Sequence, residues 1–344
     1  MRPWFYIHVA IIVALLGVVA WRAEVWHWQE AFSDFDIGLT VAAALLSVPI
    51  ALLLALRSYL IINRLGYSVR ILSLVPITLV GLMTGALTPA YAGDFVRAPL
   101  FHRHYAIPVS EGSAIVVYER AYSFLVLALT TAASAVALAV LESELAQMIA
   151  LGSAAFLAIL TALLARPISL IPRALRMLAE SGNPRRRRVL ARLVSPVENF
   201  LETGGQLLSM VRLSVLVTAA SLAIFAAMAA QLWLVAASLG LDLGPAEVWL
   251  ALGTSLLAGM LSLLPLGLGS SDATLAVILT RYGSQQIAAS SAVLFRVVYN
   301  MPLVLAGALS YLLIQSRASG RAVPEATGTS SGTKERPGPL SPRG

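Results

Sequence analysis

Two stretches of the chain place arginines and carboxylates inside otherwise apolar sequence, with the same spacing in each. The first stretch begins at Pro89 and the second at Pro265. In both, a glycine follows after four residues and an arginine after 31. These arginines are Arg120 and Arg296. A guanidinium group is a bidentate donor that suits phosphate, so the repeated chemistry points to recognition of an anion.

The candidate charged residues around these arginines include both signs. A charge inside a membrane is costly and marks a functional site when it has a partner. We expect Glu119 to pair with Arg97, which leaves Arg120 for a ligand phosphate. The carboxylates would hold the arginines or couple protons. Asp94 and Asp272 carry less weight, because they occupy different offsets in the two copies. The charged candidates are Asp94, Arg97, Glu119, Arg120, Asp272 and Arg296.

The glycines and serines of the two copies suggest a second source of donors. A helix that starts directly after Gly93 or Gly269 would present free N–H groups and a positive dipole end to an anion. Ser270 and Ser271 would add hydroxyl groups. Local alternatives remain open: the acidic residue of each copy caps or favours a helix start, and an arginine of the first copy reaches the membrane surface along its own stem.

Four polar or aromatic side chains near the arginines are secondary candidates. Tyr118 and Tyr122 flank the charged pair of the first copy, where they also suit a role as interfacial anchors. Tyr299 and Asn300 lie just after the arginine of the second copy.

The elements that position these residues belong to a membrane protein. The chain is 58% hydrophobic and only 12% charged, against about 25% charged in average soluble proteins. Cysteine is absent, the four histidines lack metal-ligand spacing, and no phosphate-binding loop or nucleophile motif occurs. We therefore expect no cofactor, no metal site, no enzymatic role and no nucleic-acid partner.

Charge alternates between the polar segments. Segment 22–36 carries a net charge of −3, whereas 57–70 carries +3 and 166–212 carries +6. The positive-inside rule then puts both termini and the two basic segments in the cytoplasm. The basic segment 57–70 and the acidic turn at residues 142–144 would then lie on opposite sides, so the chain crosses the membrane once between them. Two apolar stretches, 71–93 and 114–141, lie in this interval, and one of them must therefore enter and leave on the same side.

This count of crossings predicts an all-α integral membrane protein with two re-entrant helical hairpins. The hairpins are 71–93 and 248–271, both broken by proline and glycine, and they would enter from opposite faces to give an inverted repeat. The alternative is eight full spans. The six expected full spans are about 5–21, 37–56, 114–141, 145–165, 213–241 and 286–316.

We expect one transmembrane domain, residues 1–316, made of half-repeats 1–141 and 145–316. The basic loop 166–212 would lie on anionic headgroups as a solvated connector, with an amphipathic helix possible at 169–180. The tail 317–344, rich in Gly, Pro, Ser and Thr, is expected to be disordered.

One pattern leaves an enzymatic alternative open. Asp34 and Asp36 stand two residues apart in the first acidic segment. Two such carboxylates can hold a divalent cation, and membrane glycosyltransferases that use polyprenyl-phosphate sugars carry a similar pair. The same pattern also arises beside an ordinary helix start.

The first copy, Thr88-Pro89-x3-Gly93-Asp94-x2-Arg97 with the later Glu119-Arg120, resembles the flippase-like transmembrane domain of bacterial lysylphosphatidylglycerol synthases. The second copy, Leu264-Pro265-Leu-Gly-Leu-Gly269 with Arg296, resembles that family's Pro-x-Gly-Gly-x-Gly segment, and the likeness covers about residues 1–316. Two departures stand out. Asp272 replaces the usual glutamate, and the 344 residues hold no soluble aminoacyl-transfer domain, so lysylation of lipid is not expected.

The resemblance implies a lipid translocase in the bacterial cytoplasmic membrane. It would move an anionic or glycosylated phospholipid, a hopanoid or a polyprenyl lipid between leaflets. The alternatives are a polyprenyl-phosphate-dependent glycosyltransferase and a non-transporting accessory protein of a lipid-modifying pathway. The partners left open are the membrane lipid, a lipid-modifying enzyme or glycosyltransferase, and a second copy of the chain.

Overall fold

The computed structural model describes residues 35–139 and 184–319, apart from residue 263, together with a few residues between 148 and 155. All regular structure in these ranges is helical, which confirms the expected all-α class. The expected span at 5–21 and the tail beyond residue 319 lie outside the described residues, and so does most of the expected span at 145–165. Within the described residues, four helices are long and apolar enough to cross a membrane: Ile37–Arg64, Val109–Leu138, Val211–Ser238 and Gln285–Ser316.

The described elements repeat in one order. Each half contains a long helix, a shorter helix, a 3-10 segment, a short helix and a second long helix. The bent pair α3–α4 serves as the first long helix of the first half. In the first half the elements are α3 (Ile37–Leu45), α4 (Ser47–Arg64), α5 (Ile71–Ala86), η2 (Pro89–Val96), α6 (Arg97–Tyr105) and α7 (Val109–Ala139). In the second half they are α11 (Val211–Ser238), α12 (Pro245–Leu261), η3 (Pro265–Gly267), α13 (Ser270–Leu279) and α14 (Gln285–Ser319).

Local sequence explains how the first long helix begins and bends. Asp36 caps α3, since its Oδ1 accepts hydrogen bonds from the N–H groups of Gly38 and Leu39 at 2.7 and 3.2 Å. Pro49 in the first turn of α4 cannot donate to the carbonyl four residues earlier and crowds it. The turn at Leu46 between α3 and α4 follows from that loss.

Proline also sets the break in each hairpin. The residue before a proline is pushed into extended backbone. Thr88 and Leu264, which precede Pro89 and Pro265, both have ψ 147°. The expectation that both arms lie within 71–93 is wrong, because α5 continues through Pro76 and the returning arm is formed by η2 and α6. The second returning arm likewise extends beyond residue 271, through α13.

In both hairpins, glycine lets the chain fold back closely on the first arm. A Cβ on Gly93 would lie 2.1 Å from the carbonyl oxygen of Thr84 in α5. A Cβ on Gly267, which has φ +61°, would lie 2.6 Å from Cα of Gly259 in α12. Only a residue without a side chain fits such a contact. A glycine in each returning arm therefore lets that hairpin close, although Gly93 and Gly267 stand at different distances from their prolines.

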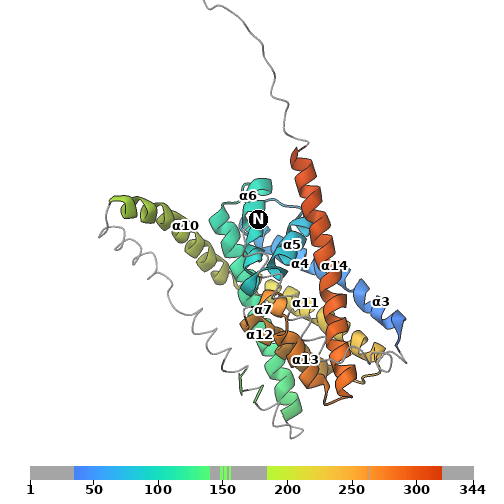
Figure 1. Ribbon diagram of the computed structural model, residues 1–344. Helices are drawn as coiled ribbons and strands as arrows, with labels where there is room; N and C mark the ends of the chain where they lie inside the picture. The colour runs from blue at the N-terminus through green and yellow to red at the C-terminus, as the bar shows by residue number, and fades with distance from the viewer. Residues whose placement is uncertain are drawn as a thin grey trace, which may run out of the picture.

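The two halves pack by exchange of equivalent helices. Helix α14 of the second half lies against α5 of the first, and α7 of the first half lies against α12 of the second. Glycine permits both contacts: a Cβ on Gly307 would lie 2.5 Å from the carbonyl oxygen of Leu79, and one on Gly253 would lie 1.9 Å from Oγ1 of Thr131. In Figure 1, α7 and α14 run in opposite directions. We call these contacts the two glycine seams.

The basic connector between the halves is partly helical. Residues 184–209 form α10 (Pro184–Ser209), which packs against α7 and α11 at its C-terminal end and extends away from the other helices in Figure 1. Leu207 of this helix is fully buried. The expectation of a solvated connector is therefore wrong for the C-terminal end of α10, which packs into the protein. The helix expected at 169–180 lies outside the described residues.

Candidate functional site

A buried charge cluster joins three helices of the membrane domain. Glu119 of α7 is completely buried, and its Oε2 accepts a hydrogen bond from Nη2 of Arg97 at 2.7 Å. Ser58 of α4 donates to the other carboxylate oxygen at 2.6 Å. Arg57, also on α4, places its Nη2 3.7 Å from Oε2 of Glu119. We call these residues the Glu119 cluster; the expected pairing of Glu119 with Arg97 is confirmed.

Arg57 is a member that the sequence reasoning missed. It was counted with the basic loop 57–70, but α4 continues to Arg64 and Arg57 is only 5% exposed. Its Nη1 donates to Ser123 of α7 at 2.7 Å and to Ser221 of α11 at 3.2 Å. The one signal in the sequence is that Arg57 directly follows an uncharged run, so a helix formed by that run could continue through it and bury it.

The alternative of an arginine reaching the membrane surface is excluded for Arg97. Its side chain is only 4% exposed and lies inside the Glu119 cluster. Arg97 is the first residue of α6, and nothing local in the sequence marks Glu119, 22 residues later, as its partner.

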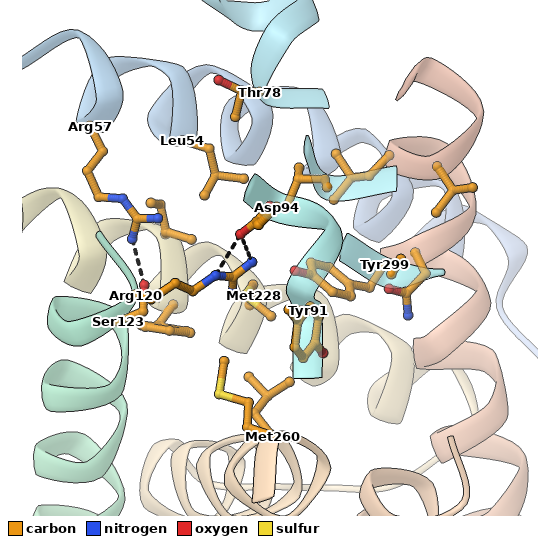
Figure 2. A pocket seen from close by; sticks show the side chains of 18 of the residues that line it. Leu54, Arg57, Thr78, Tyr91, Asp94, Arg120, Ser123, Met228, Met260 and Tyr299 are labelled. Carbon is orange, nitrogen blue, oxygen red and sulfur yellow. Dashed lines mark hydrogen bonds and ion pairs between the residues drawn. The ribbon is translucent and has the colours of Figure 1, made fainter. Parts of the chain in front are cut away.

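Asp94 pairs with Arg120 at the joint between the first hairpin and α7. Nε and Nη2 of Arg120 both donate to Oδ2 of Asp94. The ring of Tyr91 lies beneath the guanidinium, with 4.9 Å between its centroid and Cζ of Arg120. Such a contact adds a cation–π attraction. Figure 2 shows the guanidinium of Arg120 between Asp94 and Tyr91. Arg120 is therefore held by protein groups, and a ligand would compete for it.

Asp272 pairs with Arg296 at the matching joint of the second half. Nε of Arg296 donates to Oδ1 of Asp272, and its Nη2 donates to Ser271. The two acidic residues thus have the same role, although their offsets in sequence differ. The lower weight given to Asp94 and Asp272 was wrong, because the 3-10 segments differ in length: η2 has eight residues and includes Asp94, whereas η3 has three and Asp272 lies in the following α13.

The N–H groups of the two glycines are used within the protein. The N–H of Gly93 donates to Oγ1 of Thr88 at 2.6 Å. That of Gly269 donates to Oδ2 of Asp272 at 3.1 Å, so this aspartate also supports the start of α13. Ser270 donates to the carbonyl of Gly267. The expectation of open helix ends is wrong at Gly93, where α6 begins only at Arg97.

A cavity of about 100 Å³ lies between the first hairpin, α4, α7, α11, α12 and α14. A single water needs about 10–15 Å³, so the space accepts a larger polar group. Charged and apolar side chains both line it, among them Arg57, Asp94, Arg120, Met228 and Met260, which are labelled in Figure 2. We call this the first cavity.

A smaller cavity of about 30 Å³ adjoins it on the side of the second hairpin. Asp272 and Arg296 line this second cavity, while Tyr91, Tyr299 and Asn300 line both. Tyr299 stacks on Phe295 with 6.0 Å between ring centroids. The expected residues Tyr299 and Asn300 thus lie between the two charged pairs. Tyr91 was not foreseen, although it stands in the broken segment of the first copy.

Tyr118 and Tyr122 line neither cavity. Their rings lie 4.7 Å apart, and the hydroxyl of Tyr118 is 3.0 Å from Oγ of Ser214 in α11. Tyr118 is buried, and both tyrosines pack in the hydrophobic core between α4, α6, α7, α10 and α11. Their contacts are with the helix core and not with the cavities.

The described residues offer one kind of ligand chemistry. Among them no three His, Asp or Glu side chains gather where they could hold a metal ion. Guanidinium groups, hydroxyls and an amide face the cavities instead. This set suits an anion that carries hydroxyl or ester oxygens.

Comparison with known proteins is informative at the level of the family. No curated protein matches the chain. The family model described as "Lysylphosphatidylglycerol synthase TM region" matches residues 5–307, which is most of the chain. Together with its four apolar helices, this match makes the chain a multi-pass membrane protein of a lipid-modifying family. The chain belongs to the family of lysylphosphatidylglycerol synthase transmembrane regions.

Proposed function

We propose that this protein is a lipid translocase that moves an anionic or glycosylated lipid between leaflets. The observation that carries the proposal is the first cavity, which is lined by both charged and apolar side chains. An amphiphile needs both surfaces. Its headgroup would meet the arginines, and its acyl or prenyl tails would remain in the bilayer.

The arginines would take the headgroup by exchange with their carboxylates. Arg120 and Arg296 are each held by an aspartate, while Arg97 is held by Glu119. A phosphate that replaces a carboxylate at an arginine leaves that carboxylate buried without its partner, which is costly for the anion. Proton uptake by Asp94 or Asp272 would relieve this cost and couple lipid movement to protons.

The arrangement of the two halves supports alternating access. Their elements follow one order, and the corresponding helices α7 and α14 run in opposite directions (Figure 1). In our proposal the hairpins are re-entrant, enter from opposite faces and form an inverted repeat. Many transporters with such repeats bind their substrate near the midplane and expose it to each side in turn.

The proposal includes an orientation and a membrane. Both termini and the basic segments would face the cytoplasm of a bacterial cell, as the charge bias indicates. Arg57 no longer counts toward that bias, but Arg64 and Arg70 remain at the same end of α4. The membrane would be the cytoplasmic membrane.

No described residue favours the glycosyltransferase alternative. Asp36, one of the two carboxylates on which it depended, is the N-cap of α3, and Asp34 lies outside the described residues. Our proposal is therefore a transporter and not an enzyme, and it leaves the accessory role as the main competitor.

The test is transfer of labelled lipids in reconstituted vesicles. The headgroups should include phosphatidylglycerol, phosphatidylethanolamine, a glycolipid and a polyprenyl phosphate. We expect Arg120→Ala and Arg296→Ala to abolish transfer of the lipid that the wild type moves. Arg103→Ala, an exposed position at the end of α6, should retain it. Unchanged transfer in the two site variants would remove the proposal, and no transfer of any lipid by the wild type would favour the accessory role.

A further inference from the structure

The first cavity contains more positive than negative charge. Arg57, Arg97 and Arg120 line it, and the carboxylates they contact are those of Glu119 and Asp94. Arg120 and Asp94 compensate each other. Among the described residues, Arg57 and Arg97 therefore share one carboxylate, and one buried guanidinium charge has no counter-charge there.

The same two arginines also have unused donors. Nε of Arg57 and Nε of Arg97 are buried and have no hydrogen-bond partner among the described residues. Oγ1 of Thr78 on α5 is a third such atom, and its residue is 3% exposed. All three side chains line the first cavity. Buried donors are normally satisfied, and an unsatisfied charged donor is especially costly.

The second cavity differs in both respects. Its arginine, Arg296, is matched by Asp272, so the pair is neutral overall. Its remaining polar lining consists of hydroxyl and amide groups from Tyr91, Ser255, Ser271, Tyr299 and Asn300. The surplus positive charge and the donors without a partner therefore both belong to the first cavity, on one side of the residues that line both cavities, Tyr91, Tyr299 and Asn300.

We propose that Arg57, Arg97 and Thr78 form an oxyanion site in the first cavity that takes a phosphate group. The phosphate supplies the missing negative charge and accepts from both Nε–H groups and the threonine hydroxyl. The neutral second cavity takes the uncharged, hydroxylated part of the same headgroup. This assignment rests on the proposed function only in treating the phosphate as part of a lipid, because the site itself binds any phosphate-type oxyanion.

Binding is measured on the full chain, purified in a maltoside detergent that carries no phosphate. The probes are inorganic phosphate, glycerophosphoglycerol (the deacylated headgroup of phosphatidylglycerol) and chloride, at equal ionic strength. Calorimetric titration gives affinity, and circular dichroism confirms folding. We expect phosphate to bind the wild type more tightly than chloride does, and Arg57→Gln to weaken it by about tenfold or more.

Three variants keep the outcome clear. Arg57→Lys retains the charge but lacks the Nε–H, so it should also weaken phosphate binding. Thr78→Val should weaken it several-fold and is the fallback if the Arg57 variants do not fold. Arg64→Gln, exposed on the same helix, should bind as the wild type does. Wild-type affinity in folded Arg57→Gln, or chloride binding as tight as phosphate binding, would overturn the site.

The probes separate this site from the proposed function. Tighter binding of glycerophosphoglycerol than of phosphate would identify a lipid headgroup as the source. Binding of phosphate alone would retain the oxyanion site and overturn its assignment to a lipid. If phosphate binds but the vesicles show no lipid transfer, the translocase proposal fails and the site stands.

Discussion

Nη2 of Arg97 lies 2.7 Å from Oε2 of Glu119, and both side chains are almost fully buried. The two residues are 22 positions apart in sequence, and their ion pair holds the returning arm of the first hairpin against α7. Breaking one partner of a buried pair leaves the other charge uncompensated, which costs far more than the pair itself contributes.

The first prediction concerns the shared carboxylate. Glu119→Gln leaves two buried guanidinium groups without a counter-charge, so we expect a loss of about 3–5 kcal/mol in the free energy of unfolding. Denaturant titration in detergent measures it. Asp242→Asn, in the exposed loop before α12, is the control and should change stability little. A loss in Glu119→Gln below about 1 kcal/mol would show that the cluster is not buried as described.

The second prediction concerns the two matched ion pairs. Double-mutant cycles with Asp94→Asn and Arg120→Gln, and with Asp272→Asn and Arg296→Gln, should each give a coupling energy within about 0.5–3 kcal/mol. Residues in direct contact couple, whereas distant ones add. A cross-cycle of Asp94→Asn with Arg64→Gln provides the additive reference. Coupling in only one of the two pairs would contradict their equivalence.

The third prediction uses a glycine beneath an arginine. A Cβ on Gly81 in α5 would lie 2.5 Å from Cδ of Arg97. Gly81→Ala must push the side chain of Arg97 aside. We expect it to lower the free energy of unfolding by about 1–3 kcal/mol and to reduce lipid transfer. Gly204→Ala in α10 is the matched control, since nothing lies within 4 Å of its Cβ position. There alanine should be neutral or stabilise the helix by up to about 1 kcal/mol. Equal effects of the two changes would refute the contact.

The fourth prediction tests the orientation of the hairpins. The chain has no cysteine, so single cysteines can be labelled without background. Ser68→Cys and Arg103→Cys flank the first hairpin at exposed positions and should react with an impermeant reagent from the same side of the membrane. Asp242→Cys and Ser284→Cys flank the second and should react from the other side. Labelling of either pair from opposite sides would instead support eight full spans.

Sequence predicted the repeated parts of the site well. The spacing from proline to glycine and arginine identified Arg120 and Arg296, because proline and glycine fix the local backbone wherever they occur. It did not identify Arg57. Burial of that charge depends on Glu119, Ser123 and Ser221 from two other helices, and no local pattern records such partners.

Sequence was also weak where structure arises from packing alone. The helix α10 is basic and lacks a long apolar run, so its pattern resembled a solvated connector. The extent of the returning arms was underestimated for the same reason. Helix α6 carries His102, Arg103 and His104, and its polar end masked the buried face that includes Arg97 and Phe101.

The two glycine seams have a consequence for how the molecule is built. Each seam joins a helix of one half to a hairpin arm of the other, so neither half completes its own core. The chain is thus organised like a dimer of two half-length subunits joined covalently. In such an arrangement the connection mainly raises the effective concentration of one half near the other. Two separate fragments cut between the halves would then be complementary, each serving as the folding partner of the other.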